Sequence, residues 1–500
     1  MITGLEPIKH IVVLMLENRS FDNILGETFE PGVTRVNKFY PPHEHLLPIP
    51  IPGFTIGGRN LLSASIPTPD PGELFQFMNQ QIFGLLEPPP VNTPSQTEFG
   101  PLGEMGGFVQ NYLQVLTDYD YPKLLLPTIM HQYTEKQLPV TTALGKAFGV
   151  ADTYHASAPC QTMPNRCFAE MGTTLDFVNN DSYDGSYGQS HSNAPYFSTT
   201  IFNQINQTAG ADWNVYFGDF PLTLLMADTW LDLFQEKFHF FDKFQEHVDC
   251  NTLPSYSWIE PAYQLFPTDN HPPHDINLGE YLLQEVYNTL RGNQEIWEQT
   301  LLIVTYDEHG GCYDHVLPPG AEPDGDNPIF AFDRYGVRVP TLLISPYIRC
   351  GTVGAPGYEP GTGPAYDHTS ILATVRNCFD VKGGALSRRE ACAKDLGQFL
   401  TLPANDLNQG PASVSVGLSR KELEQQAVVE TISSLGQLWW DNHHKIPSSV
   451  QDVDAHKAGV YSAPPAEREL SDGEIIKGIQ DDLKRRFGRP LGSSSTLSGR

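Results

Sequence analysis

The sequence predicts an α/β fold, in which a mostly parallel sheet carries helices on both faces. Two nearly continuous apolar runs, at 8–16 and 300–306, are rich in Val, Ile and Leu. Such composition is typical of strands that are buried on both faces. An amphipathic stretch from Gly279 to Leu290 lies between the runs. This alternation favours a three-layer α/β/α sandwich.

Polar residues follow each of the two predicted strands directly. Glu17 and Asn18 come after the first strand, and Asp307 and Glu308 come after the second. Ligands of open α/β sheets bind beyond the carboxyl ends of the strands. The two pairs are therefore expected at one place.

A third apolar run, at 337–345, is also predicted to be a strand. Because it contains Pro340, which cannot donate to a ladder, its start is expected at an edge or a bulge. Long segments rich in Pro, Gly and Asn at about 27–105 and 176–200 are too long for simple connections. They are interpreted as insertions that form lids or substrate walls.

The chain changes character after residue 400. We expect a catalytic domain over 1–400, a partly helical C-terminal extension over 401–488 and a disordered polar tail over 489–500. Ser471 and Glu474 have the spacing of a capping box at the start of a helix. The apolar stripe of that helix consists of Ile475, Ile476, Ile479 and Leu483.

The chain is strongly acidic. Its 500 residues include 59 acids and 31 bases, a formal net charge of −28. Phosphate backbones repel such a chain, so nucleic-acid binding is not expected as its main role. The same charge opposes docking on anionic lipid, and a zwitterionic or small diffusible substrate fits better.

No apolar run approaches the roughly 18 residues that would span a bilayer. The N-terminal apolar run, Ile11 to Leu16, leads into Glu17 without a small-residue cleavage site, so no cleavable signal peptide is predicted. The protein is expected to be cytoplasmic, exported by another route, or a processed mature chain. At most peripheral contact with a membrane is expected.

Seven cysteines are scattered along the chain without the spacing of a zinc site. Cys160 and Cys167 bracket a candidate catalytic turn. A disulfide between them stays an option, and reduced thiols are favoured.

Glu17, Asn18, Asp307 and Glu308 are all hard oxygen donors. Grouped at strand ends, they suit a divalent cation, and an all-oxygen set favours Ca²⁺, Mg²⁺ or Mn²⁺ over Zn²⁺. One ion is expected. The alternative is that Asn18 caps the next helix and the acids are solvated.

Thr162 precedes Pro164, which is suited to the first turn of a helix. Thr162 is then expected just before the helix N-terminus, beside free backbone N–H groups that would seat a phosphate. A bound metal would lower the pKa of its hydroxyl and make it a nucleophile. Arg166 is a candidate partner for a phosphate oxygen, or equally a structural ion pair.

Four segments together resemble the phosphoesterase family, which contains bacterial acid phosphatases, bacterial phospholipases C and plant non-specific phospholipases C. They are Glu17-Asn-Arg-Ser-Phe-Asp22, Thr162-Met-Pro-Asn-Arg166, Asp269-Asn-His-Pro-Pro-His-Asp275 and Thr305-Tyr-Asp-Glu-His-Gly-Gly-Cys-Tyr-Asp-His315. The resemblance runs in order from residue 8 to about 380.

The resemblance implies an alkaline-phosphatase-like fold and a covalent phospho-enzyme on Thr162. It makes the four strand-end residues metal ligands, with Thr162 completing the shell. His271 and His274 would be active-site histidines, one holding a phosphate oxygen and one protonating the leaving alkoxide. His309 would contact substrate or orient Glu308. Three further histidines are expected to be structural: His155, His315 and His368.

Glu73 departs from the family pattern. Relatives have a phosphate-binding histidine in an Asp-Pro-x-His segment, and here the segment reads Asp70-Pro71-Gly72-Glu73. A carboxylate repels a phosphate unless it is protonated or bound to a cation. Three interpretations stay open: Glu73 is a neutral acid, it binds an added cation or a substrate's ammonium group, or activity is reduced.

A phospholipase C or related phosphodiesterase is the first functional hypothesis, with a phospholipid or small phosphoester as substrate. An acid-phosphatase-type phosphomonoesterase is the second. A binding protein or pseudoenzyme that keeps the fold is the third, supported by Glu73 alone. Sulfate-ester hydrolysis is not expected, because sulfatases of this fold need a cysteine at the position of Thr162.

Overall fold

The computed structural model describes residues 4–31, 55–56, 59–60, 65–85, 99–180, 196, 198–326, 330–355, 364–426, 433–443, 445–457 and 471–487. Large parts of the predicted insertions at 27–105 and 176–200 lie outside these residues. The predicted disordered tail, 489–500, lies entirely outside them.

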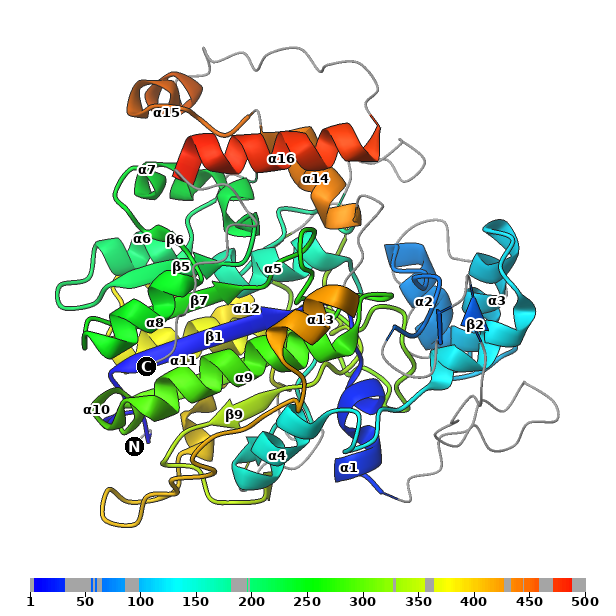
Figure 1. The fold of residues 1–500 in the computed structure, drawn as a ribbon, viewed down its shortest axis with the longest axis horizontal. Helices are drawn as coiled ribbons and strands as arrows, with labels where there is room; N and C mark the ends of the chain where they lie inside the picture. The colour runs from blue at the N-terminus through cyan, green and yellow to red at the C-terminus, as the bar shows by residue number, and fades with distance from the viewer. Residues whose placement is uncertain are drawn as a thin grey trace.

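An eight-stranded sheet forms the centre of the molecule, in the order β10-β4-β9-β8-β1-β7-β5-β6 (Figure 1). All neighbouring strands are parallel except β9, which is antiparallel to both β4 and β8. The strands are β1 (His10–Leu16), β4 (Gly149–Val150), β5 (Trp213–Phe217), β6 (Phe238–Phe240), β7 (Tyr256–Glu260), β8 (Thr300–Tyr306), β9 (Leu342–Ile344) and β10 (Thr352–Val353). The predicted, mostly parallel sheet is confirmed.

The two apolar runs form the middle of this sheet. β1 pairs with β8 along its whole length, from His10 opposite Thr300 to Leu16 opposite Tyr306. On its other side β1 pairs with β7. All of β8 is buried, and β1 is buried after His10. The carboxyl ends of β8, β1 and β7 therefore lie next to one another.

Helices cover both faces of the sheet, which confirms the three-layer prediction. In Figure 1, α9 lies in front of β1, and α11 and α12 lie behind it. One layer consists of α4 (Pro139–Ala147), α8 (Asp242–Asp249), α9 (Ile276–Gly292), α10 (Gln294–Trp297) and α13 (Arg420–Gln426). The other consists of α5 (Thr162–Met171), α6 (Ile201–Asn206), α11 (His368–Phe379) and α12 (Arg388–Cys392).

The third predicted strand is shorter than its apolar run. β9 begins at Leu342, two residues after Pro340, because the proline has no N–H to donate to a ladder. The expectation that this segment starts at an edge is wrong, since β9 lies between β8 and β4 inside the sheet.

A small lobe with its own hydrophobic core stands beside the sheet, at the right of Figure 1. It consists of α2 (Phe75–Phe83), α3 (Phe108–Asp118) and a 3-10 helix (Lys123–Met130). Part of the predicted insertion thus forms structure, and Phe108 and Tyr313 join the lobe to the loop after β8. Before it come a π-helical turn (Asp22–Gly26), α1 (Glu27–Phe29) and the hairpin of β2 (Thr55–Ile56) and β3 (Arg59–Asn60).

The C-terminal helices pack onto the main core. Trp439, Ile479 and Leu483 are fully buried in it. These helices are α14 (Ser434–His443), α15 (Val450–Lys457) and α16 (Asp472–Phe487), and they lie near α7 (Trp230–Leu233). Three short 3-10 helices complete the list, Leu222–Leu225, Ala227–Thr229 and Leu396–Phe399. A domain boundary near residue 400 stays a prediction.

The predicted cap of α16 is present, because the Ser471 N–H donates to the Glu474 carboxylate at 2.9 Å. No helix in the described part of the chain has both the length and the apolar character needed to span a membrane.

Candidate active site

Loops from the three adjacent strand ends meet at one site. The Glu17 N–H donates to the Asp269 carbonyl at 2.8 Å, which joins the loop after β1 to the loop after β7. The Arg19 N–H donates to the Glu308 carbonyl at 3.0 Å, which joins the loop after β1 to the loop after β8. The sequence prediction that the two acidic pairs share one place agrees with this arrangement.

A tight backbone contact sets the spacing of these loops. Asn18 has a left-handed backbone, with φ of 54°, and its N–H donates to Asp307 Oδ1 at 3.0 Å. Gly310 has φ of 59°, and a Cβ added to it would lie 2.2 Å from the Asn18 carbonyl oxygen. Only glycine allows the two turns to approach this closely.

Thr162 lies against Glu17 at the start of α5. Its hydroxyl donates to Glu17 Oε2 at 3.3 Å. Arg166, one turn along the helix, donates from Nε to Glu17 Oε1 at 3.0 Å and from Nη2 to the same oxygen. All three side chains are buried. The guanidinium therefore holds Glu17 in place beside the hydroxyl, as the ion-pair interpretation of Arg166 predicts.

The helix end differs in one respect from the sequence prediction. Thr162 is the first residue of α5, and Gln161 is the N-cap. Pro164 has no N–H, and the Met163 N–H donates to Asn180 Oδ1 at 2.8 Å. The helix terminus therefore offers fewer free N–H groups to an anion than the sequence pattern indicates.

Several buried oxygens at the site have no hydrogen-bond partner among the described residues. They are Asn18 Oδ1, Asp307 Oδ2 and Glu308 Oε1, each on a side chain with no exposed surface. Burying a polar oxygen without a partner is costly. Carboxylate and amide oxygens of this kind are ligands for a hard divalent cation, so these residues fit the predicted metal.

The acids of the site perturb one another. Burial raises the pKa of Glu17 well above its usual value, the Asp307 charge raises it further, and Arg166 opposes the change. Burial also raises the pKa of Glu308, with Glu73 and Asp307 as the next causes. A cation at this site would relieve both effects.

Glu73 lies directly beside the predicted ligands. It accepts a hydrogen bond from Asn18 Nδ2, and its Oε1 is 3.7 Å from His271 Nε2. Asp70 Oδ1 is 3.7 Å from His271 Nδ1. Burial raises the pKa of Glu73, whereas His271 and Asn18 lower it. The residue at the family's usual histidine position is therefore part of the site.

His274 forms a pair with an aspartate. Its Nδ1 lies 2.7 Å from Asp269 Oδ1, and the His274 side chain is 19% exposed while Asp269 is 1% exposed. A carboxylate on Nδ1 orients the ring and leaves Nε2 as the reactive nitrogen. Sequence analysis missed Asp269 as a functional residue, although it opens the segment that contains His271 and His274.

His309 lies behind Glu308. Its Nδ1 is 3.3 Å from Glu308 Oε2, and its Nε2 is 2.8 Å from Gln81 Oε1. Burial lowers the pKa of His309 to about 3, so the ring is neutral. Gln81 Oε1 can only accept, so Nε2 carries the single hydrogen of the neutral ring and Nδ1 has none to donate to Glu308. His309 therefore packs against Glu308 without donating a hydrogen bond to it. Gln81 has no signature in the sequence.

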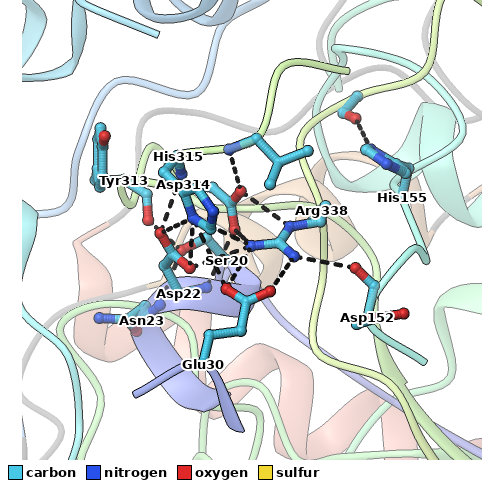
Figure 2. A network of polar contacts seen from close by, with 12 residues as sticks. Ser20, Asp22, Asn23, Glu30, Asp152, His155, Tyr313, Asp314, His315 and Arg338 are labelled. Atoms are coloured by element: carbon cyan, nitrogen blue, oxygen red, sulfur yellow. Dashed lines mark hydrogen bonds and ion pairs between the residues drawn. The ribbon is translucent and has the colours of Figure 1, made fainter. Parts of the chain in front are cut away.

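A second charged network joins the chain after β1 to the chain after β8 (Figure 2). Arg338 donates from Nε to Asp314 Oδ1 at 3.0 Å, from Nη2 to Asp22 Oδ1 at 3.2 Å and from Nη1 to Glu30 Oε1 at 2.9 Å. His315 Nδ1 lies 2.9 Å from Asp22 Oδ2. This network links the chain after β1 with the chain after β8.

The other histidines and the cysteines have structural surroundings. His155 Nδ1 is 2.9 Å from the Gly336 carbonyl, and His368 Nε2 is 2.6 Å from the Asp307 carbonyl. Cys160 and Cys167 are both buried free thiols.

Of the described residues, two compact clusters have the donor spacing of a metal site. Asp70, Glu73 and His271 form one, and Asp22, Asp314 and His315 form the other, with one donor atom from each residue within 4.8 Å of the others. The predicted set of Glu17, Asp307 and Glu308 is more open than these clusters. The site thus contains residues that could hold a metal ion.

Comparisons with known proteins agree with this geometry. Residues 8–382 match the Phosphoesterase family. Non-specific phospholipase C6 of Arabidopsis thaliana is 34% identical over 418 residues, which cover 80% of this chain and 74% of that protein. Phospholipase C A of Mycobacterium tuberculosis is 28% identical over 413 residues, covering 75% of this chain and 74% of that protein.

Among solved structures, the lipoteichoic acid synthase LtaP from Listeria monocytogenes aligns with a TM-score of 0.34 and 13% identity, over 66% of this chain and 88% of that one. A similarity of this size carries no information about activity. The sequence match spans all four motifs and the whole central sheet up to α11. This chain belongs to the Phosphoesterase family and is a hydrolase of phosphoester bonds.

Proposed function

We propose that the protein is a phospholipase C-type phosphodiesterase that works through a phospho-threonine on Thr162. The observation that carries the proposal is the buried hydroxyl of Thr162, which donates to Glu17 at 3.3 Å among converging carboxylates. A hydroxyl with an adjacent acceptor at a helix N-terminus is the arrangement that an oxygen nucleophile needs.

One divalent cation would be held by Glu17, Asn18, Asp307 and Glu308, with Thr162 completing the set. The unpartnered oxygens of Asn18, Asp307 and Glu308 support this assignment. An all-oxygen set favours Ca²⁺, Mg²⁺ or Mn²⁺ over Zn²⁺. When bound, the ion would offset charge on the phosphoryl oxygens and lower the pKa of the hydroxyl.

The reaction follows from the placement of two groups. Thr162 Oγ1 attacks phosphorus, and Glu17 Oε2, its hydrogen-bond acceptor, takes the hydroxyl proton. The bond from phosphorus to the diacylglycerol oxygen breaks, and His274, oriented by Asp269, gives a proton to that oxygen. Water then attacks the phosphorus, and His274 takes a proton from the water. The bond from phosphorus to Thr162 breaks, and Glu17 returns its proton to the Thr162 oxygen.

The remaining site residues have supporting roles in this proposal. Arg166 fixes Glu17 through its two donors to Oε1. His309 packs behind Glu308, with Gln81 against its other nitrogen. His271 and Glu73 lie on the side of Asn18 where the phosphate's remaining oxygens would bind.

A phospholipid with a zwitterionic headgroup is the proposed substrate class. The names of the plant and mycobacterial relatives support a phospholipid. The net charge of −28 opposes binding to anionic membranes and leaves zwitterionic lipid as the better match.

The nucleophile is tested with Thr162→Ala, Thr162→Ser and a matched control, Thr142→Ala, which alters another buried threonine in α4. Release of diacylglycerol from phosphatidylcholine is expected to disappear in Thr162→Ala, to persist in part in Thr162→Ser and to stay in Thr142→Ala. Acid-quenched enzyme should carry phosphate on residue 162. If Thr162→Ala keeps its turnover, the mechanism is wrong.

Substrate class is tested in the same preparations. Hydrolysis of p-nitrophenyl phosphorylcholine should exceed hydrolysis of p-nitrophenyl phosphate if the enzyme is a diesterase. The reverse order would make it a phosphomonoesterase. Removal of metal by a chelator should abolish turnover, and Ca²⁺, Mg²⁺ or Mn²⁺ should restore it. An enzyme that turns over at full rate without metal would refute the ligand assignment.

A further inference from the structure

The two compact acidic clusters of the described residues differ in how their charge is balanced. In the cluster of Asp22, Asp314 and His315, the guanidinium of Arg338 pairs with both carboxylates, as Figure 2 shows. In the cluster of Asp70, Glu73 and His271, no described arginine or lysine forms an ion pair with either acid. The first cluster is complete without a metal, whereas the second lacks a cation.

Arg19, which lies near the second cluster, does not fill this role. Its Nε donates to the Asn270 carbonyl at 2.7 Å, and its Nη1 donates to the Ile66 carbonyl. These bonds direct Nε and Nη1 to backbone oxygens, and Nη2 forms no hydrogen bond with the cluster. The Asp70 side chain is 36% exposed, and its Oδ1 has no hydrogen-bond partner among the described residues.

The histidine of the cluster presents a lone pair. His271 Nδ1 is 2.6 Å from the Pro272 carbonyl, which can only accept, so Nδ1 carries the hydrogen. Its Nε2 is 3.0 Å from Asn18 Nδ2, which can only donate, so Nε2 accepts. A ring in this tautomer cannot donate to a phosphate oxygen from Nε2, but it can bind a metal there.

Asn18 lies between the cluster and the strand-end acids. The side chain has no exposed surface, and its Nδ2 contacts both Glu73 Oε1 and His271 Nε2. The other end of the same amide, Oδ1, is buried without a partner. Nδ2 thus contacts the cluster, and Oδ1 is the ligand proposed for the first ion, so the two ions would lie on either side of this amide.

The charges of the whole site point the same way. Six carboxyl groups converge here: Glu17, Asp70, Glu73, Asp269, Asp307 and Glu308. Two guanidiniums, those of Arg19 and Arg166, accompany them. With all six carboxyl groups ionised, six negative and two positive charges leave a net charge of −4, of which one divalent ion offsets half.

We propose that Asp70, Glu73 and His271 bind a second divalent cation next to the one held by the strand-end residues. The inference rests on the proposed function and adds to it a two-metal site. A mixed imidazole and carboxylate set favours a transition-metal ion such as Mn²⁺ over Ca²⁺. With the ion bound, the Glu73 side of the site attracts phosphate oxygens.

Metal content of the full-length protein tests the proposal without turnover. Protein saturated with Mn²⁺ and passed through a desalting column should hold two equivalents per chain by elemental analysis. Glu73→Gln and Asp70→Asn should each hold one. Asp118→Asn, an exposed acid at the end of α3, is the matched control and should hold two. One equivalent in the unmodified protein, or two in Glu73→Gln, overturns the proposal.

Electron paramagnetic resonance on the unmodified protein gives a second readout that does not depend on any variant folding. Two neighbouring Mn²⁺ ions should give a spin-coupled spectrum that becomes the six-line spectrum of an isolated ion in Glu73→Gln. An isolated-ion spectrum at full loading refutes the second site. If tetramethylammonium instead binds in a Glu73-dependent way to a one-metal protein, the cluster recognises a headgroup and the proposal fails.

The outcome is separable from that of the proposed function. His274→Gln, which alters no proposed metal ligand, should keep two equivalents of Mn²⁺ although its turnover of diesters with alkoxide leaving groups is slowed. Turnover that persists in Thr162→Ala would refute the nucleophile and leave the metal count untouched.

Discussion

Replacement of Arg338 by methionine should destabilise the protein strongly, although Arg338 is not a proposed ligand or catalytic group. Its guanidinium is the shared cation of three carboxylates, Asp22, Glu30 and Asp314, and its Nη1 also donates to the Asp152 carbonyl at 3.0 Å (Figure 2). Methionine keeps much of the apolar volume and removes the charge. The perturbation therefore isolates the electrostatic role of the network.

The magnitude follows from burial of the partners. Asp22 and Asp314 are 1% and 0% exposed, so each is left as a buried carboxylate without its cation. Breaking a buried pair by removing one partner costs about 3–5 kcal/mol. Glu30 is 19% exposed and adds little, because solvent screens it. A total loss of about 3–5 kcal/mol is expected, a large share of the 5–15 kcal/mol typical of a folded domain.

Urea denaturation followed by tryptophan fluorescence measures the change, because urea adds no salt that would screen the pairs. Arg338→Met should lower the urea midpoint. The double variant Arg338→Met/Asp22→Asn should lose about 0.5–3 kcal/mol less stability than the sum of the two single losses, and this difference is the interaction energy of the pair. The urea midpoint of Arg338→Lys should lie between those of Arg338→Met and the unmodified protein. A lysine keeps the charge but cannot donate to three carboxylates in a fixed fork.

A second readout connects the network to the site. The network joins the chain after β1 to the chain after β8, so Arg338→Met should also weaken Mn²⁺ binding by calorimetry. If Arg338→Met unfolds within 1 kcal/mol of the unmodified protein, the premise that this cation compensates buried charge is refuted. If Arg338→Met is destabilised but binds Mn²⁺ as tightly as the unmodified protein, the network does not position the ligand loops.

Three further outcomes are expected. Burial lowers the pKa of His315, but its aspartate hydrogen bond and nearby charges outweigh this and raise the pKa above 6.5, so its stabilising effect is present below pH 6.5 and is lost as pH rises through the raised value. His315→Gln should therefore flatten the fall in urea midpoint above pH 6.5, and an unchanged pH profile would contradict this sign. Gly310→Ala should cost more stability and metal affinity than Gly210→Ala, because both have a positive φ but a Cβ at Gly210 meets nothing within 4 Å, whereas one at Gly310 strikes backbone at 2.2 Å; equal losses measured by urea would show that only backbone strain matters. Asp269→Asn and His274→Gln should slow diesters with alkoxide leaving groups by up to about 10²–10⁴, yet spare p-nitrophenyl diesters, whose leaving group needs no proton. Equal slowing of both ester types would refute the assignment of His274 as the general acid.

Local sequence patterns were sufficient to predict the strand ends and the helix start that carry the site residues. The apolar runs that form β1 and β8 end at Glu17 and Asp307 because a strand buried on both faces must give way to polar residues where the sheet meets the ligand. The proline after Thr162 predicts a helix start, and α5 begins there. These features depend on neighbours in the chain, so a single sequence contains them.

Pairings between distant elements could not be predicted in the same way. The sequence leaves open whether Arg166 contacts phosphate or an acid, and the crossing of α5 behind β1 places it on Glu17. Pro340 suggested an edge strand, but the antiparallel insertion of β9 between β4 and β8 is a property of the whole sheet.

Sequence alone thus determined the α/β class, the strand-end acids and the helix-borne threonine, because apolar periodicity and turn chemistry act within a few residues. Tertiary structure decided what surrounds them. Asn18 contacts Glu73, which is 55 residues away along the chain, and His271, which is 253 residues away. Burial then sets the cost of every unpaired oxygen at the site, and burial exists only in the folded chain.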